Sequence, residues 1–286
     1  MRLACFLLLA LAALGPAQER KLRIIAIGAH PDDCDIKFAG TAYKFIQAGH
    51  AVKFLSVTNG DAGHHEMGGG MLAKRRYLET QESARRLGVS EYEVLDNHDG
   101  ELTPNLEVRR QIIRSIRRWK ADIVIAPRPN DYHPDHRYAG VLVQDAAYMV
   151  VVPNVTPDVP PLENNPIFLY YNDNFQKPAP FRPDIVVALD DVWDKKVNAL
   201  DAHTSQFYEW LPWVDHRLAE VPKDPAERKK WLTGMRVQRV NEASRATLTR
   251  RYGAAKAGTV KYTEAFELCE YGKQPSLDEL DKIFPR

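Results

Sequence analysis

The chain has 286 residues, 44% of them hydrophobic, which is enough to bury the core of one large domain. Its 39 Lys and Arg residues balance 38 Asp and Glu residues, and the resulting net charge of +1 gives no reason to expect nucleic acid or an anionic membrane as a partner. Three cysteines in a chain of this length exclude a disulfide framework.

The N-terminus, residues 1–17, has the pattern of a signal peptide. Arg2 supplies a positive start, an unbroken apolar run follows over residues 3–14, and the small residues Gly15 and Ala17 suit a signal peptidase. The apolar run is shorter than the roughly 20 residues that cross a membrane comfortably. We therefore predict cleavage after Ala17 and export of the mature chain, as a periplasmic or secreted protein. An uncleaved anchor is the alternative.

Two cysteines, Cys34 and Cys269, remain after the predicted cleavage. An oxidising compartment permits a disulfide between them. Two free thiols are equally compatible with the sequence, because the geometry that decides between these states is not visible in it.

After the leader, short apolar runs alternate with segments of helical periodicity. The predicted strands are, in chain order, residues 22–29, 51–58, 92–96, 121–127, 167–171 and 184–189. The predicted helices are residues 36–49, 71–88, 106–119, 136–149, 192–203 and 239–253. This alternation predicts an α/β fold with a Rossmann-like, doubly wound and mostly parallel sheet in a single domain. We place that domain at residues 22–270, followed by an irregular C-terminal tail over residues 271–286.

Polar clusters directly follow four of the predicted strands. They read HPDD after the first strand, NGDAGHHE after the second, DNHDG after the third and RPNDYHPDH after the fourth. Ligands of such sheets bind at the carboxyl ends of the strands. We therefore expect the four clusters to meet in one functional site.

The first and fourth clusters contain the side chains of a catalytic zinc site. His30 and Asp33 lie three residues apart on a strand-to-helix turn, and catalytic zinc usually takes three such ligands and a water. The third ligand could be His133 or His136. Asp32 could then act as general base toward the metal-bound water, while a histidine beside the metal stabilises the oxyanion. Either motif alone could be a helix cap, but two at strand ends are hard to explain in that way.

These motifs resemble those of the PIG-L/LmbE-like de-N-acetylase family. Besides AHPDD and HPDH, the matching segments are TNGDAG (58–63), RYLETQESARRLG (76–88), DNHDGEL (96–102), HTSQ (203–206) and YTEAFE (262–267). Together they span most of the mature chain. The resemblance implies a zinc-dependent enzyme that removes acetyl groups from N-acetylglucosamine-type substrates. Together with the leader it suggests a bacterial source.

The resemblance also implies a role for each matching residue. The metal ligands it implies are His30, Asp33 and His136. The catalytic residues it implies are Asp32, as general base, and His133, as oxyanion stabiliser or general acid. The substrate-binding residues it implies are Arg76, Asp99 and His203.

Several residues near these motifs have two interpretations. Arg76 could instead form a structural ion pair, and His203 could be a hydrogen-bonded core histidine. Cys34 stands where the family often has Glu, and it could be a soft metal ligand or a small buried residue. The other residues with a functional and a structural interpretation are Arg75, His64 and His65 in a glycine-rich loop, and Trp210 and Trp213, which could stack on a sugar or pack in the core.

The leading functional prediction is removal of the N-acetyl group from an N-acetylglucosamine-type sugar or glycoconjugate by a zinc-bound water. Iron or another divalent ion could replace zinc. The alternatives are an amidase acting on a non-sugar N-acyl substrate and a sugar-binding protein without catalysis. Retention of Asp32 and His133 argues against the second alternative. A nucleotide-binding protein is disfavoured, because the first turn lacks Gly-x-Gly-x-x-Gly and carries carboxylates. We expect no nucleic-acid partner and no stable membrane span, and the sequence leaves the oligomeric state open.

Overall fold

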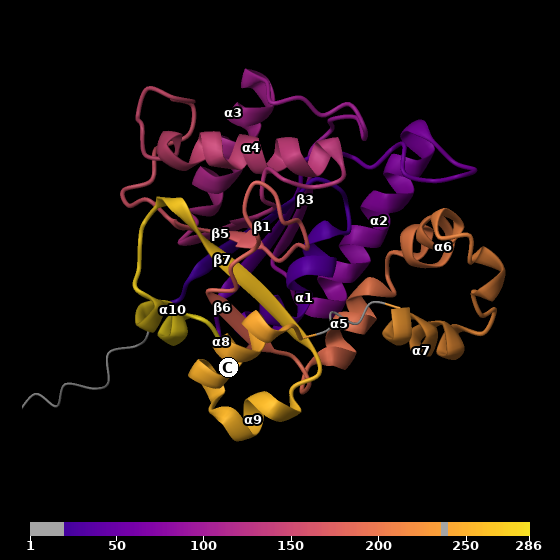
Figure 1. The fold of residues 1–286 in the computed structure, drawn as a ribbon. Coiled ribbons are helices and arrows are strands. Elements are labelled where there is room, and N and C mark those ends of the chain that lie inside the picture. The colour runs from indigo at the N-terminus through magenta and orange to yellow at the C-terminus, as the bar shows by residue number, and fades with distance from the viewer. Residues whose placement is uncertain (1–19, 236–239) are drawn as a thin grey trace, which may run out of the picture.

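The computed structural model describes residues 20–235 and 240–286 (Figure 1). The predicted signal peptide, residues 1–17, lies outside this part of the chain and stays a prediction. Within the described residues, no helix combines the length and the apolar character that crossing a membrane requires.

Seven strands form one sheet in the described residues. They are β1 (Arg23–Gly28), β2 (Ala51–Ser56), β3 (Glu91–Val94), β4 (Ile123–Ala126), β5 (Ile167–Tyr171), β6 (Ile185–Ala188) and β7 (Thr263–Gly272). Their order in the sheet is β3-β2-β1-β4-β5-β7-β6. The first five strands of this order are parallel, whereas β7 runs antiparallel to both β5 and β6. The predicted single-domain α/β fold with a mostly parallel sheet is therefore confirmed.

Helices fill the connections between the strands. The longer ones are α1 (Asp33–Gln47), α2 (Gly69–Leu87), α3 (Leu106–Trp119), α4 (Pro134–Met149), α5 (Trp193–Leu200), α7 (Pro225–Met235) and α8 (Glu242–Tyr252). The shorter ones are the π-helical turn η1 (Gln206–Trp210), α6 (Leu211–Val214), the 3-10 turn η2 (Leu218–Glu220), α9 (Ala254–Thr259) and α10 (Leu277–Ile283). For the long helices that the sequence predicted, the predicted and observed bounds differ by a few residues at the ends, whereas α7 was not predicted.

The helices cover both faces of the sheet, as Figure 1 shows for α3 and α4 on one side and α1 and α5 on the other. Alternate residues of β1 pack against the helices on opposite faces of the sheet. Ile24 packs with the α1, α2 and α5 side, whereas Ile25 packs with the α3 and α4 side. This alternation follows from the pleat of a strand that is buried on both faces. It explains why the strand reads as a continuous apolar run rather than as an alternating one.

Strand β7 is the main departure from the predicted fold, because no strand was predicted over its residues and the tail from residue 271 onward was expected to be irregular. Its Glu264 is almost fully buried, and a buried carboxylate is unusual in a central strand. The ammonium of Lys196 lies 2.6 Å from that carboxylate, and the backbone N–H groups of Gly40 and Thr41 donate to it at 3.1 and 2.7 Å. These partners are all distant from Glu264 in the sequence. They stabilise its buried carboxylate, which the pattern of apolar and polar residues could not explain.

The C-terminal residues 271–286 also contain regular structure. They include the end of β7 and helix α10, which Ser276 begins with a reciprocal cap to Glu279. Leu280 and Phe284 are buried against the α1 side of the sheet. This segment therefore contributes to the core of the domain.

Cys34 and Cys269 are free, buried thiols. The Cys34 thiol donates to the carbonyl of Ala26 at 3.3 Å on the α1 side, and the Cys269 thiol donates to the hydroxyl of Tyr170 at 3.0 Å. The two cysteines belong to core clusters on opposite faces of the sheet. They do not form a disulfide, and Cys34 is a core residue rather than a metal ligand.

Candidate metal centre and active site

The polar clusters meet at the carboxyl ends of β1 and β4. The connections from these two adjacent parallel strands lead to helices on opposite faces, α1 and α4, so a crevice opens between them. The turn after β1 carries His30, Asp32 and Asp33, and the loop after β4 carries His133 and His136. The fold therefore brings together residues about a hundred positions apart.

The turn after β1 is built around Asp33. Its Oδ2 accepts hydrogen bonds from the backbone N–H groups of Ala29 and His30, both at 2.8 Å. Asp33 is also the first residue of α1, where a carboxylate interacts favourably with the helix dipole. Gly28 permits this turn, since a Cβ placed there would lie 2.5 Å from the Cβ of Asp33. The carboxylate is thus fixed before any ligand binds.

Three donor side chains converge in the crevice. Nδ1 of His30 lies 3.1 Å from Nε2 of His136 and 3.6 Å from Oδ2 of Asp33. Nε2 of His136 lies 3.5 Å from Oδ1 of Asp33. Ligands about 2.0–2.2 Å from a tetrahedral zinc ion are separated by roughly 3.3–3.5 Å. Two imidazole nitrogens and one carboxylate at these separations fit a divalent ion, so the three residues form a candidate metal site.

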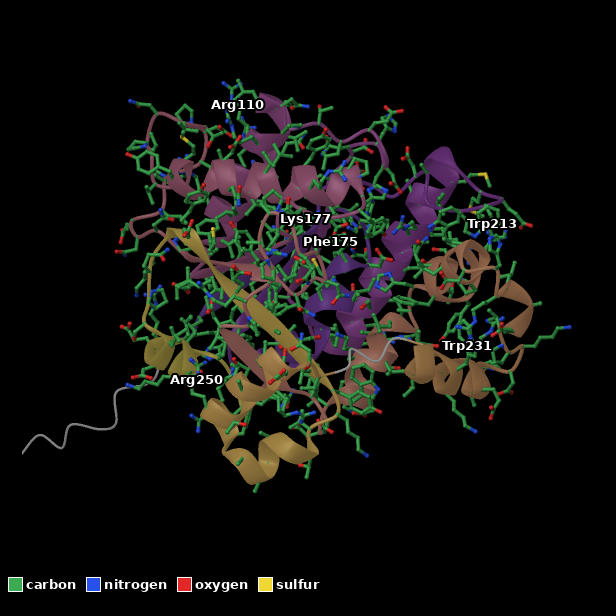
Figure 2. All side chains as sticks on the ribbon, viewed as in Figure 1. Arg110, Phe175, Lys177, Trp213, Trp231 and Arg250 are labelled. Atoms are coloured by element: carbon green, nitrogen blue, oxygen red, sulfur yellow. The ribbon has the colours of Figure 1, made fainter. Side chains whose placement is uncertain are left out.

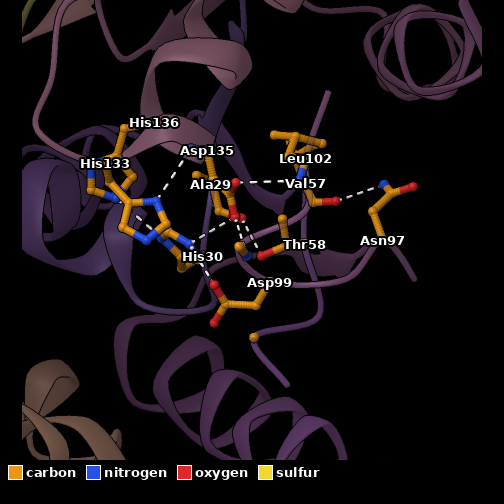
Figure 3. A network of polar contacts seen from close by, with 12 residues as sticks. Ala29, His30, Val57, Thr58, Asn97, Asp99, Leu102, His133, Asp135 and His136 are labelled. Carbon is orange, nitrogen blue, oxygen red and sulfur yellow. Dashed lines mark hydrogen bonds and ion pairs between the residues drawn. The ribbon is translucent and has the colours of Figure 1, made fainter. Parts of the chain in front are cut away.

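Each histidine of this site has a carboxylate near its remote ring nitrogen. Nδ1 of His136 pairs with Asp131 at 2.8 Å. Nε2 of His30 lies 3.1 Å from Asp99 and 3.3 Å from Asp135 (Figure 3). Carboxylates in such positions fix the tautomer and orientation of metal-binding histidines. Burial alone would lower the pKa of His136, but the nearby carboxylates outweigh it and raise that pKa to about 9.

Asp131 and Asp135 were not assigned these roles from the sequence. Both lie in the RPNDYHPDH cluster, so the signal was present. The requirement of a carboxylate behind each metal-binding histidine could have identified them.

A second group of donors shares His30. The side chains of His30, Asp99 and His133 present atoms that lie within 4.8 Å of one another. In the group of His30, Asp33 and His136, every pair of side chains approaches within 3.6 Å. In the second group, Asp99 is already paired with the guanidinium of Arg76. The group of His30, Asp33 and His136 is therefore the better candidate for the metal.

Asp32 lies beside the candidate metal site, and a buried arginine fixes it. Nη2 of Arg76 lies 3.2 Å from Oδ1 of Asp32, and Nη1 lies 3.4 Å from Oδ2 of Asp99 and 3.2 Å from the carbonyl of Gly60. Gly60 has φ +72°, and a Cβ there would lie 2.6 Å from Nη1 of Arg76. Arg76 therefore forms the structural ion pairs that the sequence left open, and it also lines the cavity of the site.

The two carboxylates that Arg76 contacts have different proton affinities. Burial raises the pKa of Asp32, and the Arg76 charge only partly offsets this effect. Asp99 is also buried, but His30 and Arg76 lower its pKa to about 2. Asp32 is thus the better proton acceptor of the two.

His133 caps helix α4 and faces the same crevice. Its Nδ1 accepts a hydrogen bond from the backbone N–H of Asp135 at 3.2 Å. The neutral ring must then carry its proton on Nε2. Burial and the charges of His30 and His136 lower the pKa of His133, which favours this neutral form.

The cavity above these residues has a volume of about 460 Å³. Among the predicted site residues it is lined by His30, Asp32, Asp33, Arg76, Asp99, His133 and His136. His203 is different. It is fully buried, does not line the cavity, and its Nε2 lies 3.0 Å from Oδ2 of Asp35. The structure thus places His203 behind the site, as a core histidine paired with a carboxylate, and not at a position that contacts substrate.

The glycine-rich loop after β2 lies beside this cavity. Nε2 of His64 pairs with Glu209 at 2.8 Å, and Arg75 binds both oxygens of the same carboxylate at 2.7 and 2.6 Å. His65 stacks between His64 and Trp213. The histidines therefore hold the loop against the segment around Glu209, and among the described residues neither of them belongs to a group of donors that could hold a metal ion.

Comparisons with known proteins show which family the chain resembles in sequence. The sequence model of the GlcNAc-PI de-N-acetylase family, PIG-L, matches residues 25–147, which contain both the HPDD and the HPDH motif. Diacetylchitobiose deacetylase of Thermococcus kodakarensis is 34% identical over 203 residues, covering 67% of this chain and 73% of the relative. A probable N-acetyl-alpha-D-glucosaminyl L-malate deacetylase of Bacillus cereus is 26% identical over 219 residues, covering 73% of this chain and 93% of the relative.

The fold is also similar to that of a solved deacetylase. The structure of N,N'-diacetylchitobiose deacetylase from Pyrococcus horikoshii in complex with an inhibitor superposes with a TM-score of 0.64 and 26% sequence identity. The similarity covers 86% of this chain and 83% of that one.

Proposed function

This chain belongs to the PIG-L family of de-N-acetylases, and from that premise we propose that it removes the N-acetyl group of an N-acetylglucosamine-type sugar by metal-dependent hydrolysis. One observation carries the proposal: each of three metal-type side chains approaches the other two within 3.6 Å, and a second carboxylate, Asp32, lines the same cavity. The deacetylase activities of the relatives agree with it.

In this proposal, His30, Asp33 and His136 hold one divalent ion, with zinc as the expected metal. Such an ion acts as a Lewis acid and lowers the pKa of a bound water to roughly 7. The remaining chemistry belongs to side chains of this chain, and hydrolysis breaks the amide C–N bond to give acetate and a free amine.

Asp32 is the proposed proton carrier. Its carboxylate accepts a proton as water adds to the acyl carbon, and the raised pKa makes it a stronger base than an exposed aspartate. Arg76 holds the carboxylate in place through the 3.2 Å ion pair. Because the leaving nitrogen must gain a proton when the C–N bond breaks, the protonated Asp32 can return one to it.

His133 is the proposed oxyanion stabiliser. With Nδ1 occupied by the N–H of Asp135, its Nε2–H is free to donate to the oxygen that becomes negative as water adds. The lowered pKa favours the neutral ring, so hydrogen-bond donation suits His133 better than the role of general acid.

The proposal is tested on the mature chain, purified from Gln18 onward. Metal content is measured by mass spectrometry, and amine release is assayed on a panel of N-acetylated amino sugars with and without a chelator. We expect about one metal ion per chain and chelator-sensitive release. Bound metal without release from any sugar would contradict the proposed substrate class, and a folded, metal-replete preparation that binds no metal would contradict the site.

A further inference from the structure

The cavity extends beyond the residues that the proposed reaction uses. Besides the metal-type donors, Arg76 and Asp99, its lining includes Trp210, Leu211 and Val214 from the segment of η1 and α6, which we call the apolar end. Its volume of about 460 Å³ lies within the range of roughly 300–1,000 Å³ for sites that enclose ligands larger than a single amino sugar. The apolar end therefore has room for a group attached to the reacting sugar.

The apolar end is backed by a stack of four aromatic rings. Trp210 stacks on Trp213 with centroids 5.3 Å apart and an interplanar angle of 15°. Trp213 stacks on His65 at 5.3 Å and 10°, and His65 stacks on His64 at 4.6 Å and 20°. Trp210 is the end of this stack that lines the cavity. Trp213 belongs to α6, and Figure 2 shows it at the right-hand side of the molecule.

Hydrogen bonds at the far end hold the stack in place. His64 pairs with Glu209, and Glu209 also pairs with Arg75 of α2. Nε2 of Gln206 lies 3.1 Å from the carbonyl of Gly63, so loop and helical segment are joined a second time. Trp210 thus has a defined position before any ligand binds, which reduces the entropy lost on binding. It also ends a π-helical turn, a distortion that frequently marks functional sites.

The charges around the cavity favour a neutral group at this end. Among the described residues that line it, the Lys and Arg side chains are Lys37 and Arg76. Lys37 donates to the carbonyl of Asn172 at 2.9 Å, and Arg76 is paired with Asp32 and Asp99. No Lys or Arg adjoins Trp210 in this lining to bind a carboxylate or phosphate of the substrate. A sugar ring has no charge, and its C–H face packs well on an aromatic ring.

We propose that Trp210, positioned by the stack, determines specificity by packing against a second, neutral sugar ring that is joined to the reacting N-acetylated sugar. The inference rests on the proposed function and adds to it the class of substrate, a neutral N-acetylated oligosaccharide. Asp32 and the metal-type donors act on the amide, while Trp210 binds the neighbouring ring.

The test compares N,N'-diacetylchitobiose with N-acetylglucosamine. The measured quantity is the ratio of kcat/KM for the disaccharide to kcat/KM for the monosaccharide, so a partial loss of folded enzyme cancels. We expect this ratio to be well above one in the wild type and to fall by about tenfold in Trp210→Ala, because one aromatic contact contributes on the order of 1.4 kcal/mol. Trp210→Phe keeps a ring and should restore most of the ratio. The matched control is Tyr148→Ala, an exposed aromatic about 18 Å along α4 from His136.

The possible results distinguish failure of this inference from failure of the proposed function. No amine release from any N-acetylated sugar would contradict the proposed function itself. Release with a ratio that Trp210→Ala leaves unchanged would overturn only the role of Trp210. Preference for N-acetylglucosaminyl malate over the disaccharide would also overturn the inference, because an acidic group would then occupy this end.

A binding measurement covers the case in which Trp210→Ala does not fold. Calorimetry on the metal-loaded wild-type enzyme compares cellobiose with glucose, which are both uncharged and carry no N-acetyl group. We expect the disaccharide to bind at least about tenfold more tightly. Equal affinities would overturn the proposal without any variant.

Discussion

The variant Asp32→Asn tests the proposed proton carrier with little change in shape. Asp32 is not one of the three donors of the candidate metal site. Its side chain forms the ion pair at 3.2 Å with Arg76, and Arg76 keeps Asp99 and the carbonyl of Gly60 as acceptors in the variant. We therefore expect the variant to fold and to bind metal as the wild type does.

The expected loss is in the rate of amide hydrolysis. A positioned general base contributes about 10²–10⁴-fold to a rate, which corresponds to about 2.7–5.4 kcal/mol of activation free energy. A value near the upper limit is expected, because burial raises the pKa of Asp32 and makes it a good proton acceptor, whereas an amide side chain accepts no proton at neutral pH. The same group also returns the proton in our proposal, so both halves of the reaction lose it.

The assay measures kcat for amine release at saturating metal, together with bound metal by mass spectrometry and the melting temperature. The matched control is Asp33→Asn, which changes the neighbouring carboxylate and should lose metal as well as activity. Wild-type turnover in Asp32→Asn would refute the assignment of the base. Loss of metal in Asp32→Asn, with the fold intact, would refute the separation of roles between the two adjacent aspartates.

Three further predictions concern the metal site, its turn and the thiols. Nearby carboxylates raise the pKa of His136 to about 9, so zinc must displace a proton from it below that pH. Calorimetry on the metal-free chain should show proton release and an affinity that rises by up to about tenfold per pH unit from pH ~7 to ~9, and a flat profile would contradict the pairing. Gly28→Ala places a Cβ 2.5 Å from that of Asp33 and should cost about 1–3 kcal/mol of unfolding free energy, with weakened metal binding; an unchanged urea midpoint would argue against the close packing of this turn. Because Cys34 and Cys269 are free and lie on opposite faces of the sheet, a reductant should leave the melting temperature unchanged, whereas a decrease would indicate a disulfide.

Much of the fold could be predicted from the chain because its strands are buried on both faces. Such strands, β1 and β4 for example, read as apolar runs whatever their neighbours are. Strand β7 could not be predicted in this way. It contains Glu264, and only the contact with Lys196 and two backbone N–H groups makes that carboxylate compatible with a central strand.

In the candidate site, too, some residues could be predicted from the sequence and others could not. His30, Asp32, Asp33, His133 and His136 could be predicted because they follow apolar strands directly, where chemistry and not packing accounts for polar side chains. The HTSQ motif could not show whether His203 faces the cavity or the core. That depends on the packing that buries His203 against Asp35.

By itself, the sequence determined the fold class, the strand ends that carry the chemistry and the types of donor they supply, because these follow from local patterns of apolar and polar residues. The tertiary structure decided which atoms meet. It places Nδ1 of His30 against Nε2 of His136, ties Nδ1 of His133 to a backbone N–H, and sets Asp131 behind His136. It also stacks His65 on Trp213. Contacts of this kind depend on distances between segments far apart in the chain, which only the packing of helices on the sheet can fix.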